Sequence, residues 1–474
     1  MEQMWASSLE NAVAALSSGD YATALKALRP LAAQGNSNAQ YNLGVMYREG
    51  HGVPQDYTEA VKWFRLAAEQ GHPGAQHNLG VMYRDGIGVP QDYAEGEKWF
   101  CRSEAQGNAT KQYILAQKYL QGHGVAQDYP EAVKWFHLSA AHGNTDAQYN
   151  LGVMYRDGIG VPQDYTEALN WFRLTAAIGD ASAQYDLGMM YERAQGAPQD
   201  SREALKWFRM SAAQGHPGAQ YILGWVYLQG QSVVQDYGEA LKWLWQSAAK
   251  GNSNAQNTLG VMYAKGLGVP QDYTEAIKWF RLAAEQGDPG AQNSLGVMYR
   301  DGTGVPQDYA EAVKWYRLSA AQGDAAAQTS LGVMYDKGHG VPQDYAEAGK
   351  WYRLAAVQGH SDAQYNLALM YFHGHGVLQE STEALKWLRL AAVQGHVEAQ
   401  NNLGVMYLQG QGVPQDYVRA HMWFSLSAAH STGDEQKLAE ENRDEVARRM
   451  TPDQIAKAQT MARDCQQRNF KGCN

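Results

Sequence analysis

The stretch NSNAQYNLGVMYREGHGVPQDYTEAVKWFRLAAEQG, residues 36–71, decides the fold because almost the whole chain is copied from it. Its Gln40 recurs every 36 residues as far as Gln400, and its Trp63 recurs in the same way as far as Trp423. Eleven repeats follow one another without an insertion. A fixed period of this length is typical of a solenoid, in which each repeat buries its apolar face against its neighbours.

Each repeat is expected to form two helices joined by a turn. Apolar and small residues recur at helical spacing in both halves: Ala39, Leu43, Gly44, Met46 and Tyr47 in the first, Ala60, Trp63, Phe64, Ala67 and Ala68 in the second. Asn36 and Asp56 stand where N-caps are needed, and Glu59 completes a start similar to a capping box. Gly50 and Pro54 end the first helix, and Gly71 ends the second.

These residues resemble a known family. The run Leu43 to Tyr47 and the spacing of Ala60 and Phe64 resemble the tetratricopeptide repeat, whose unit is 34 residues. The two additional residues and the run from Asp56 to Trp63 resemble its relative, the Sel-one-like repeat. The resemblance covers about residues 36–431. It implies a family of adaptors and scaffolds with many unrelated partners.

We therefore predict an all-α fold, a right-handed superhelical α/α solenoid of eleven 36-residue helix-turn-helix repeats with helical caps. Residues 1–35 are expected to form an N-terminal capping hairpin, and residues 36–431 the eleven repeats. Residues 432–474 are expected to form a C-terminal helical cap, in which Thr451 and Gln454 make a capping box for the last helix.

The acidic charge does not identify a partner. The formal net charge is −10, but the Asp56 and Glu59 series together supply 21 of the 49 acidic residues, all at helix starts. No basic stripe appears, which argues against nucleic acid as the principal partner. No run of 18 apolar residues occurs, so we expect no membrane span.

The cysteines and the N-terminus bear on the compartment. Cys465 and Cys473 are eight residues apart, a spacing that permits a loop-closing disulfide, and the alternative is two free thiols. No signal peptide is visible at the N-terminus. Relatives are often exported, so the resemblance implies a periplasmic or secreted bacterial protein if an upstream signal peptide was removed. The alternative is a cytoplasmic protein.

The junction of repeats 2 and 3 departs from the pattern. Glu97 and Glu104 replace Val and Ala of the second helix, and Lys111 and Lys118 replace Ala and Met of the next first helix. We predict that Glu104 and Lys111 pair across the turn at Gly107. The junction is either a hinge or docking point, because unpaired charge in a repeat interface is costly, or a tolerated irregularity.

Comparison of the repeats separates two faces of the first helix. The constant set is Ala39, Gln40, Leu43, Gly44 and Tyr47. The variable set, here called the variable face, consists of Asn38, Tyr41, Asn42, Val45, Arg48, Glu49 and their equivalents. Members of the variable set are three to four residues apart and share one helix side. Positions that pack against identical neighbours meet identical demands, so the variable face is expected to point outward. In tetratricopeptide proteins the matching positions line the concave groove.

We predict that a protein or peptide segment binds the variable face across repeats 3 to 6. The predicted anchors are Tyr113, Tyr149, Tyr185, Tyr221, Trp225 and Leu228. The resemblance implies that Asn150 holds the backbone of a ligand, and Arg156 could pair with an acidic side chain or a C-terminal carboxylate. The alternative is that these rings rest on adjacent helices and fill the interior of the superhelix.

No convergent catalytic group is found in the sequence. The candidate side chains recur in register, as scaffolding residues do, and the Asp56 and Glu59 series are engaged in capping. His373 and His375 are the one tight histidine pair, and we interpret them as turn residues rather than metal ligands.

We expect a non-enzymatic scaffold or adaptor, monomeric and without a cofactor. The alternative is a hydrolase with cell-wall or penicillin-like substrates, as proposed for cysteine-rich relatives, although those carry a cysteine pair in each repeat and this chain does not. A further possibility is recent duplication of the repeats with little selected contact to a partner.

Overall fold

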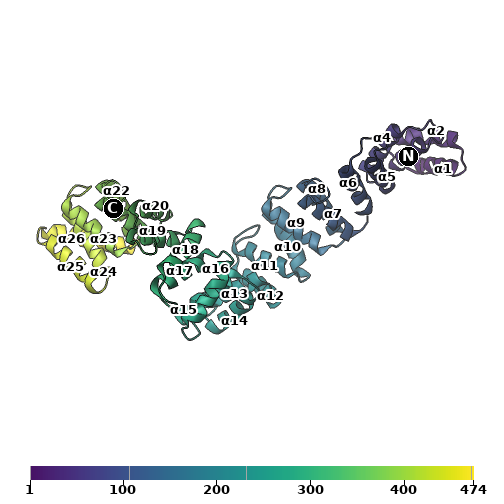
Figure 1. The fold of residues 1–474 in the computed structure, drawn as a ribbon. Coiled ribbons are helices and arrows are strands. Elements are labelled where there is room, and N and C mark those ends of the chain that lie inside the picture. Colours follow the sequence, from purple (N-terminus) through teal and green to yellow (C-terminus); the bar gives the residue numbers. More distant parts are fainter. Residues whose placement is uncertain (1, 106, 231, 471, 474) are drawn as a thin grey trace. The chain divides into compact units, whose positions relative to one another are not determined.

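The computed structural model describes residues 2–105, 107–230, 232–470 and 472–473. These ranges contain 26 α-helices and no strand, which confirms the all-α prediction (Figure 1). The chain forms two compact units, residues 1–219 and 220–474. Each unit is described by itself. Within a unit, most helices pack beside the next helix along the chain.

The first unit starts with a hairpin of two helices, and pairs of similar helices follow. The bounds are α1 (Glu2–Ser17), α2 (Tyr21–Ala33), α3 (Ser37–Glu49), α4 (Tyr57–Glu69), α5 (Pro73–Asp85), α6 (Tyr93–Ala105), α7 (Ala109–Gln121), α8 (Tyr129–Ala141), α9 (Thr145–Asp157), α10 (Tyr165–Ala177), α11 (Ala181–Glu192) and α12 (Ser201–Ala213). Helix α13 (Pro217–Gln229) contains the boundary between the units.

The second unit continues the pairs and ends with two further helices. The bounds are α14 (Tyr237–Ala249), α15 (Ser253–Lys265), α16 (Tyr273–Glu285), α17 (Pro289–Asp301), α18 (Tyr309–Ala321), α19 (Ala325–Lys337), α20 (Tyr345–Val357), α21 (Ser361–His373), α22 (Ser381–Ala392), α23 (Val397–Gln409), α24 (Tyr417–His430), α25 (Gly433–Ala447) and α26 (Pro452–Gln467).

The predicted caps set the helix bounds in the first repeat. The Asn36 side chain accepts a hydrogen bond from the Ala39 N–H at 2.9 Å, and the Asp56 side chain accepts one from the Glu59 N–H at 2.9 Å. Gly50 ends α3 in the left-handed region with φ 75°. The Glu59 carboxylate pairs with the Lys62 ammonium instead of closing a full capping box.

A glycine lets the two helices of a repeat approach closely. Phe64 is fully buried, and a Cβ placed on Gly44 would lie 2.6 Å from the Phe64 ring. The same contact recurs in most repeats, for example between Gly260 and Phe280 at 2.6 Å. The recurring glycine is therefore explained by the aromatic ring that it admits.

Glutamines of the first helix join most repeats to the one before. Gln328 is 5% exposed; its Nε2 donates to the Ala320 carbonyl oxygen at 3.2 Å and its Oε1 accepts from Gln358 Nε2 at 2.8 Å. The donor bond recurs at Gln40, Gln76, Gln148, Gln184, Gln256, Gln292, Gln364 and Gln400. Each of these carbonyl oxygens also accepts a hydrogen bond from the N–H of the glycine three residues later, so the glutamine adds a second bond at the helix end.

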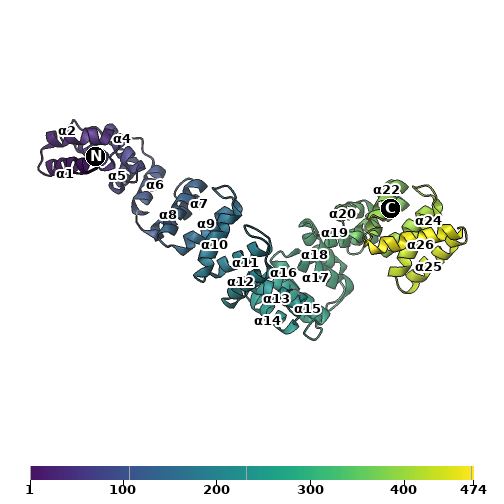
Figure 2. The same ribbon diagram turned by 180° about the vertical axis from the view of Figure 1, so that it is seen from behind.

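The last two helices cover the outer side of the final repeat. Helices α25 and α26 pack against α24, as Figure 2 shows. Met422 and Leu426 of α24 are 2% and 0% exposed, although Leu390, the equivalent of Leu426 one repeat earlier, is 41% exposed. The predicted capping box of Thr451 and Gln454 is present at the start of α26.

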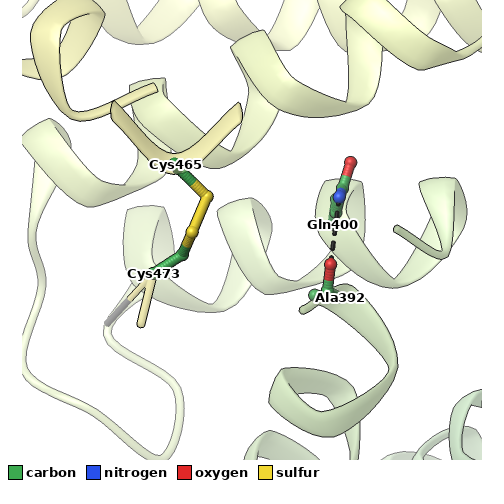
Figure 3. Close-up of a disulfide and its surroundings, with 4 residues drawn as sticks. All are labelled: Ala392, Gln400, Cys465 and Cys473. Atoms are coloured by element: carbon green, nitrogen blue, oxygen red, sulfur yellow. Dashed lines mark hydrogen bonds between the residues drawn. A yellow bond between two sulfur atoms is a disulfide. The ribbon is translucent and has the colours of Figure 1, made fainter. Parts of the chain in front are cut away.

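A disulfide closes the end of the chain. Cys465, on α26, is bonded to Cys473, and their Cα atoms are 5.4 Å apart (Figure 3). Both cysteines are nearly buried and belong to the same hydrophobic core as Met422 and Leu426. The bond therefore holds Cys473 against the cap.

Candidate partner-binding face

Hairpin packing leaves one side of each first helix outside the core. In α9, the constant residues Ala147, Leu151 and Met154 are at most 2% exposed. Tyr149 and Arg156, on the variable face, are only partly buried. The helix period of 3.6 residues accounts for this division, because the two sets lie on opposite sides.

A polar network spans repeats 4 and 5 on this face. Tyr149 Oη donates to Asp186 Oδ2 at 2.9 Å, and Arg156 Nη1 donates to Asp186 Oδ1 at 3.0 Å. Arg156 also donates two hydrogen bonds to the Asp157 carboxylate, from Nε to Oδ1 at 2.7 Å and from Nη2 to Oδ2 at 2.9 Å. The guanidinium predicted to pair with a partner's carboxylate therefore has two acidic partners within the chain.

Burial changes the pKa values of two groups in this network. It raises the pKa of Asp186, although the Arg156 guanidinium and the Tyr149 hydroxyl oppose the rise. It also raises the pKa of Tyr149, and the nearby Asp186 carboxylate adds to the effect. Tyr149 is therefore a hydrogen-bond donor at neutral pH, and Asp186 is its acceptor.

Asp186 was not among the predicted site residues. Its position corresponds to Asn42, and the other repeats carry Asn, Ile, Thr or Ser there. A single carboxylate in a column of neutral residues was the available signal. Its partners, 30 and 37 residues earlier, could not be read from one repeat, since they depend on how neighbouring repeats pack.

The predicted tyrosines of the first unit rest partly on their own hairpins. The rings of Tyr113, Tyr149 and Tyr185 lie 5.7–5.9 Å from the phenylalanine of the second helix of the same repeat. Tyr185 also stacks on His216 at 4.6 Å. Each of the three is half-buried, so one side of each ring packs on adjacent helices. Asn150 is bonded within its helix, to the Asp146 carbonyl oxygen at 2.7 Å.

The predicted anchors on α13 differ in accessibility. Trp225 is 40% exposed, and its ring centroid lies 6.5 Å from that of Tyr221. Leu228 is 7% exposed and belongs to the core with Leu244 and Leu259. Leu228 therefore has little exposed surface: its column is polar in several other repeats, but here an aliphatic side chain turns into the core.

A polar cavity adjoins the network of Asp186. It has a volume of about 370 Å³, and we call it the Arg193 cavity. It is lined by Arg156, Asp157, Gln163, Tyr165, Tyr185, Asp186, Met189, Met190, Arg193 and Gln195. Arg193 makes no ion pair with any other residue that the structure describes. Arg156 is shared between the two aspartates, so the four charged side chains of the lining sum to zero and the Arg193 guanidinium balances the second carboxylate without bonding to it.

The junction of repeats 2 and 3 is polar and its charges are paired. The predicted pair of Glu104 and Lys111 is confirmed, at 3.5 Å. Lys118 also pairs with Glu97 at 3.1 Å. Arg102 pairs with Glu131 of α8. The departures from the repeat pattern therefore compensate one another across α6 and α7.

Cys101 lies in this junction, 3.1 Å from the Lys118 ammonium. Burial raises the pKa of its thiol, although Lys118 opposes the rise. A raised pKa keeps the sulfur as a thiol at neutral pH, which is the weakly nucleophilic form.

The histidine pair lies at a helix end: His373 is the last residue of α21 and His375 follows in the turn. The rings of His373 and His375 lie 5.5 Å apart, and His375 stacks on Tyr345 at 4.9 Å. Among residues 2–105, 107–230, 232–470 and 472–473, no three His, Cys, Asp or Glu side chains are grouped as metal ligands. No helix within those ranges has both the length and the apolar character that a membrane crossing requires.

Comparisons with known proteins place these repeats. The model of the Sel1 repeat family matches eleven consecutive segments: 37–72, 73–108, 112–144, 145–180, 181–216, 217–252, 253–288, 289–324, 325–360, 361–396 and 397–431. The chain belongs to the Sel1 repeat family. The resemblance drawn from the sequence is thereby confirmed.

Solved Sel1 repeat structures agree with this assignment. The chain is 36% identical to c5321, a protective antigen of uropathogenic Escherichia coli with this fold, over 95% of this chain and 96% of that one, with a TM-score of 0.70. It is 33% identical to a Sel1 repeat protein from Oxalobacter formigenes, over 65% of this chain and 89% of that one, with a TM-score of 0.52. A comparison with curated protein sequences gave no significant match.

The Sel1 repeat solenoid is typical of protein–protein interaction scaffolds. Its members are generally non-enzymatic, and a solenoid of this kind suggests protein partners.

Proposed function

We propose that this Sel1 repeat protein is a non-enzymatic scaffold that binds a protein or peptide segment on its variable face. The observation that carries the proposal is the Arg193 cavity beside the network of Tyr149, Arg156 and Asp186. Internal hydrogen bonds fix the side chains of this network, so a ligand meets a surface that is already ordered. Such preorganisation reduces the entropy lost on binding.

The lining of the Arg193 cavity suits a polar or acidic segment. Tyr185 and Met189 provide apolar walls, and the Arg193 guanidinium provides planar donors that match a carboxylate. Tyrosine and arginine are also the residue types that dominate the energies of protein interfaces.

The same proposal places the protein in the bacterial envelope or outside the cell. The Cys465–Cys473 disulfide supports this placement, since disulfides persist mainly in oxidising compartments. Fractionation of source cells carrying the gene with its native upstream sequence tests it. We expect the two thiols to resist alkylation in the periplasmic or secreted fraction. A reduced pair in the cytoplasm would contradict the placement.

Binding is tested by capture with the immobilised full chain. The variant Tyr185→Ala/Arg193→Gln removes one wall and the unpaired guanidinium of the cavity. We expect the amount of partner that this variant captures from an extract of the source organism to fall at least about tenfold, because tyrosine and arginine side chains carry a large share of the binding energy in protein interfaces.

The matched control is Tyr129→Ala/Arg202→Gln, which removes the same two residue types from exposed positions outside the cavity. Thermal unfolding first establishes that both variants fold. Equal capture of every protein by the wild type and by both variants would refute a binding role for this part of the variable face.

A further inference from the structure

A second cavity lies on the variable face of repeats 10 and 11, in the unit of residues 220–474. Its volume is about 210 Å³, and we call it the Leu388 cavity. It is lined by Ala368, Leu369, Phe372, His373, Leu388, Asn402, Val405 and Met406. The floor is formed by side chains at most 4% exposed, Ala368, Leu388 and Met406. The remaining five positions belong to the variable face, so the cavity opens on that side.

A departure from the repeat pattern creates this space. Nine of the eleven repeats have Phe or Tyr at the position of Phe64, and this ring fills the gap beside the first helix. Repeat 10 carries Leu388 there, opposite Ala368 in place of the usual glycine. The shorter Leu side chain leaves unfilled the volume that an aromatic ring takes elsewhere.

The residues that form the wall of the Leu388 cavity also differ from those of other repeats, and they too are large and apolar. Phe372 occupies the position of Arg48, which is Arg in four repeats, and Leu369 occupies the position of Val45. A charged side chain at position 372 would have placed a guanidinium beside the opening. The substitutions in repeat 10 together make a site that is apolar inside.

The volume of the cavity selects the size of its occupant. A dry cavity of about 150 Å³ lined by aliphatic and aromatic side chains is large enough to bind benzene. Pockets for whole drug-sized ligands are roughly 300–1,000 Å³. At about 210 Å³, the Leu388 cavity has room for one large aliphatic or aromatic group, but it is too small for a cofactor.

The rim carries polar atoms that suit a peptide backbone. Asn402 Nδ2 donates to Tyr365 Oη at 3.4 Å, which orients the amide. Asn402 Oδ1 accepts no hydrogen bond from the residues that the structure describes. It is therefore an acceptor beside an apolar pocket, where the N–H of an extended peptide would need one. The exposed His373 lies at the same rim, its ring fixed edge-on against Phe372 at 5.1 Å.

We propose that the Leu388 cavity receives one large apolar side chain, Leu, Ile, Met or Phe, from an extended peptide segment of the partner, and that Asn402 receives the adjoining backbone N–H. This inference rests on the proposed function and adds to it a specificity-determining pocket. The partner would carry an apolar anchor residue. The site for that residue, in repeats 10 and 11, is distinct from the one in repeats 3 to 6 that the sequence indicated.

The test fills the cavity with the residue that other repeats use. Leu388→Phe should place a ring in the cavity, and the chain tolerates Ala opposite Phe, since Ala116 and Phe136 are both 0% exposed in repeat 3. The matched control is Leu244→Phe, the same change in the one other repeat that carries Leu in this column. A second variant, Val405→Phe, narrows the opening from a partly exposed position.

A phage-displayed library of random dodecapeptides is panned on the full-length wild type, and selected peptides are then measured against each folded variant. We expect selected peptides to share one large apolar residue. Leu388→Phe and Val405→Phe should reduce the affinity of the chain for these peptides about ten- to hundredfold, as expected for the loss of one buried apolar side chain. Leu244→Phe should leave their affinity unchanged.

Three other results would overturn the inference. Selected peptides that bind Leu388→Phe as well as the wild type would remove the cavity from the site while leaving the proposed function standing. A library that yields no binder to the wild type would count against both. A dimer of the wild type that Leu388→Phe dissociates would assign the cavity to a second copy of the chain.

Discussion

At the scale of single residues, the buried glutamine is the most informative constant position. Its recurrence beside Ala39 indicates a packing role, but the structure shows that it is a connector with a donor and an acceptor bond. Gln400 is one exception: its Nε2 donates to the Ala392 carbonyl oxygen at 3.0 Å, as Figure 3 shows, while its buried Oε1 has no donor in the part of the chain described. The equivalent of Gln358 in repeat 11 is His430, which bonds within its own helix.

This difference predicts unequal costs for the same substitution. Gln328→Leu should reduce the stability of its repeat by about 1–3 kcal/mol, because it removes two hydrogen bonds, one to the Ala320 carbonyl oxygen and one from Gln358, each worth about 0.5–1.5 kcal/mol. Gln400→Leu should cost about 1 kcal/mol less, since it also removes an unsatisfied oxygen. Hydrogen exchange of α19 and α23 measures the two local costs. A larger loss for Gln400→Leu would contradict this account.

Residue-level interpretation from the sequence succeeds where one repeat contains all the partners. The cap of Asp56 on Glu59 and the turn at Gly50 involve residues within a few positions, and both were predictable. The network of Asp186 was not, because its partners come from the repeat before. The two cavities were also beyond prediction, since each depends on volumes left between three or more helices.

At the scale of elements, the pair α6 and α7 shows how a solenoid accommodates charge. The helix bounds follow the repeat as elsewhere, so the period and the caps were enough to predict them. The sequence predicted one charge pair, Glu104 with Lys111, and left open whether the junction is a hinge or docking point or a tolerated irregularity. The structure has two ion pairs across the junction, Glu97 with Lys118 and Glu104 with Lys111.

A double-mutant cycle tests that compensation. Lys118→Met alone should destabilise the junction slightly, because it leaves Glu97 without its cation beside apolar residues. Glu97→Val/Lys118→Met, which restores the common residues, should be at least as stable as the wild type, since a half-exposed ion pair contributes only about 0–1 kcal/mol. Additive effects of the two single changes would contradict the pairing. Thermal unfolding of the four proteins is the measurement.

The cycle should also depend on pH. Lys118 lowers the pKa of Glu97 below its usual value. The pair therefore stabilises the fold fully above the pKa of an unfolded glutamate, about 4.3, and loses its effect as pH falls through the lowered folded value. The coupling measured at pH 7 should shrink at pH 3.

At the scale of the whole molecule, the end of the chain is closed by covalent chemistry as well as by packing. The α24 face that would meet a twelfth repeat is covered, and the Cys465–Cys473 bond fastens the cover. A terminal repeat must present a face that tolerates water, and the polar outer sides of α25 and α26 supply it.

Reduction of this bond should loosen the cap and leave the regular repeats unchanged. Closing a loop of eight residues corresponds to about 2–3 kcal/mol by loop entropy. We therefore expect dithiothreitol to raise hydrogen exchange in α26 and the outer side of α24, with residues 253–360 unaffected. The variant Cys465→Ser/Cys473→Ser should exchange as the reduced wild type does and should not respond to the reductant. Faster exchange throughout the array would contradict a local role.

The glutamine column has a further consequence for how such a gene can change in length. In residues 284–364, each seam between neighbouring repeats offers the same carbonyl group and the same amide as the next. Unequal recombination that removes or adds a whole repeat rejoins identical partners, while an insertion of any other size displaces every later one. The number of repeats can thus change in evolution without altering the contacts inside the protein.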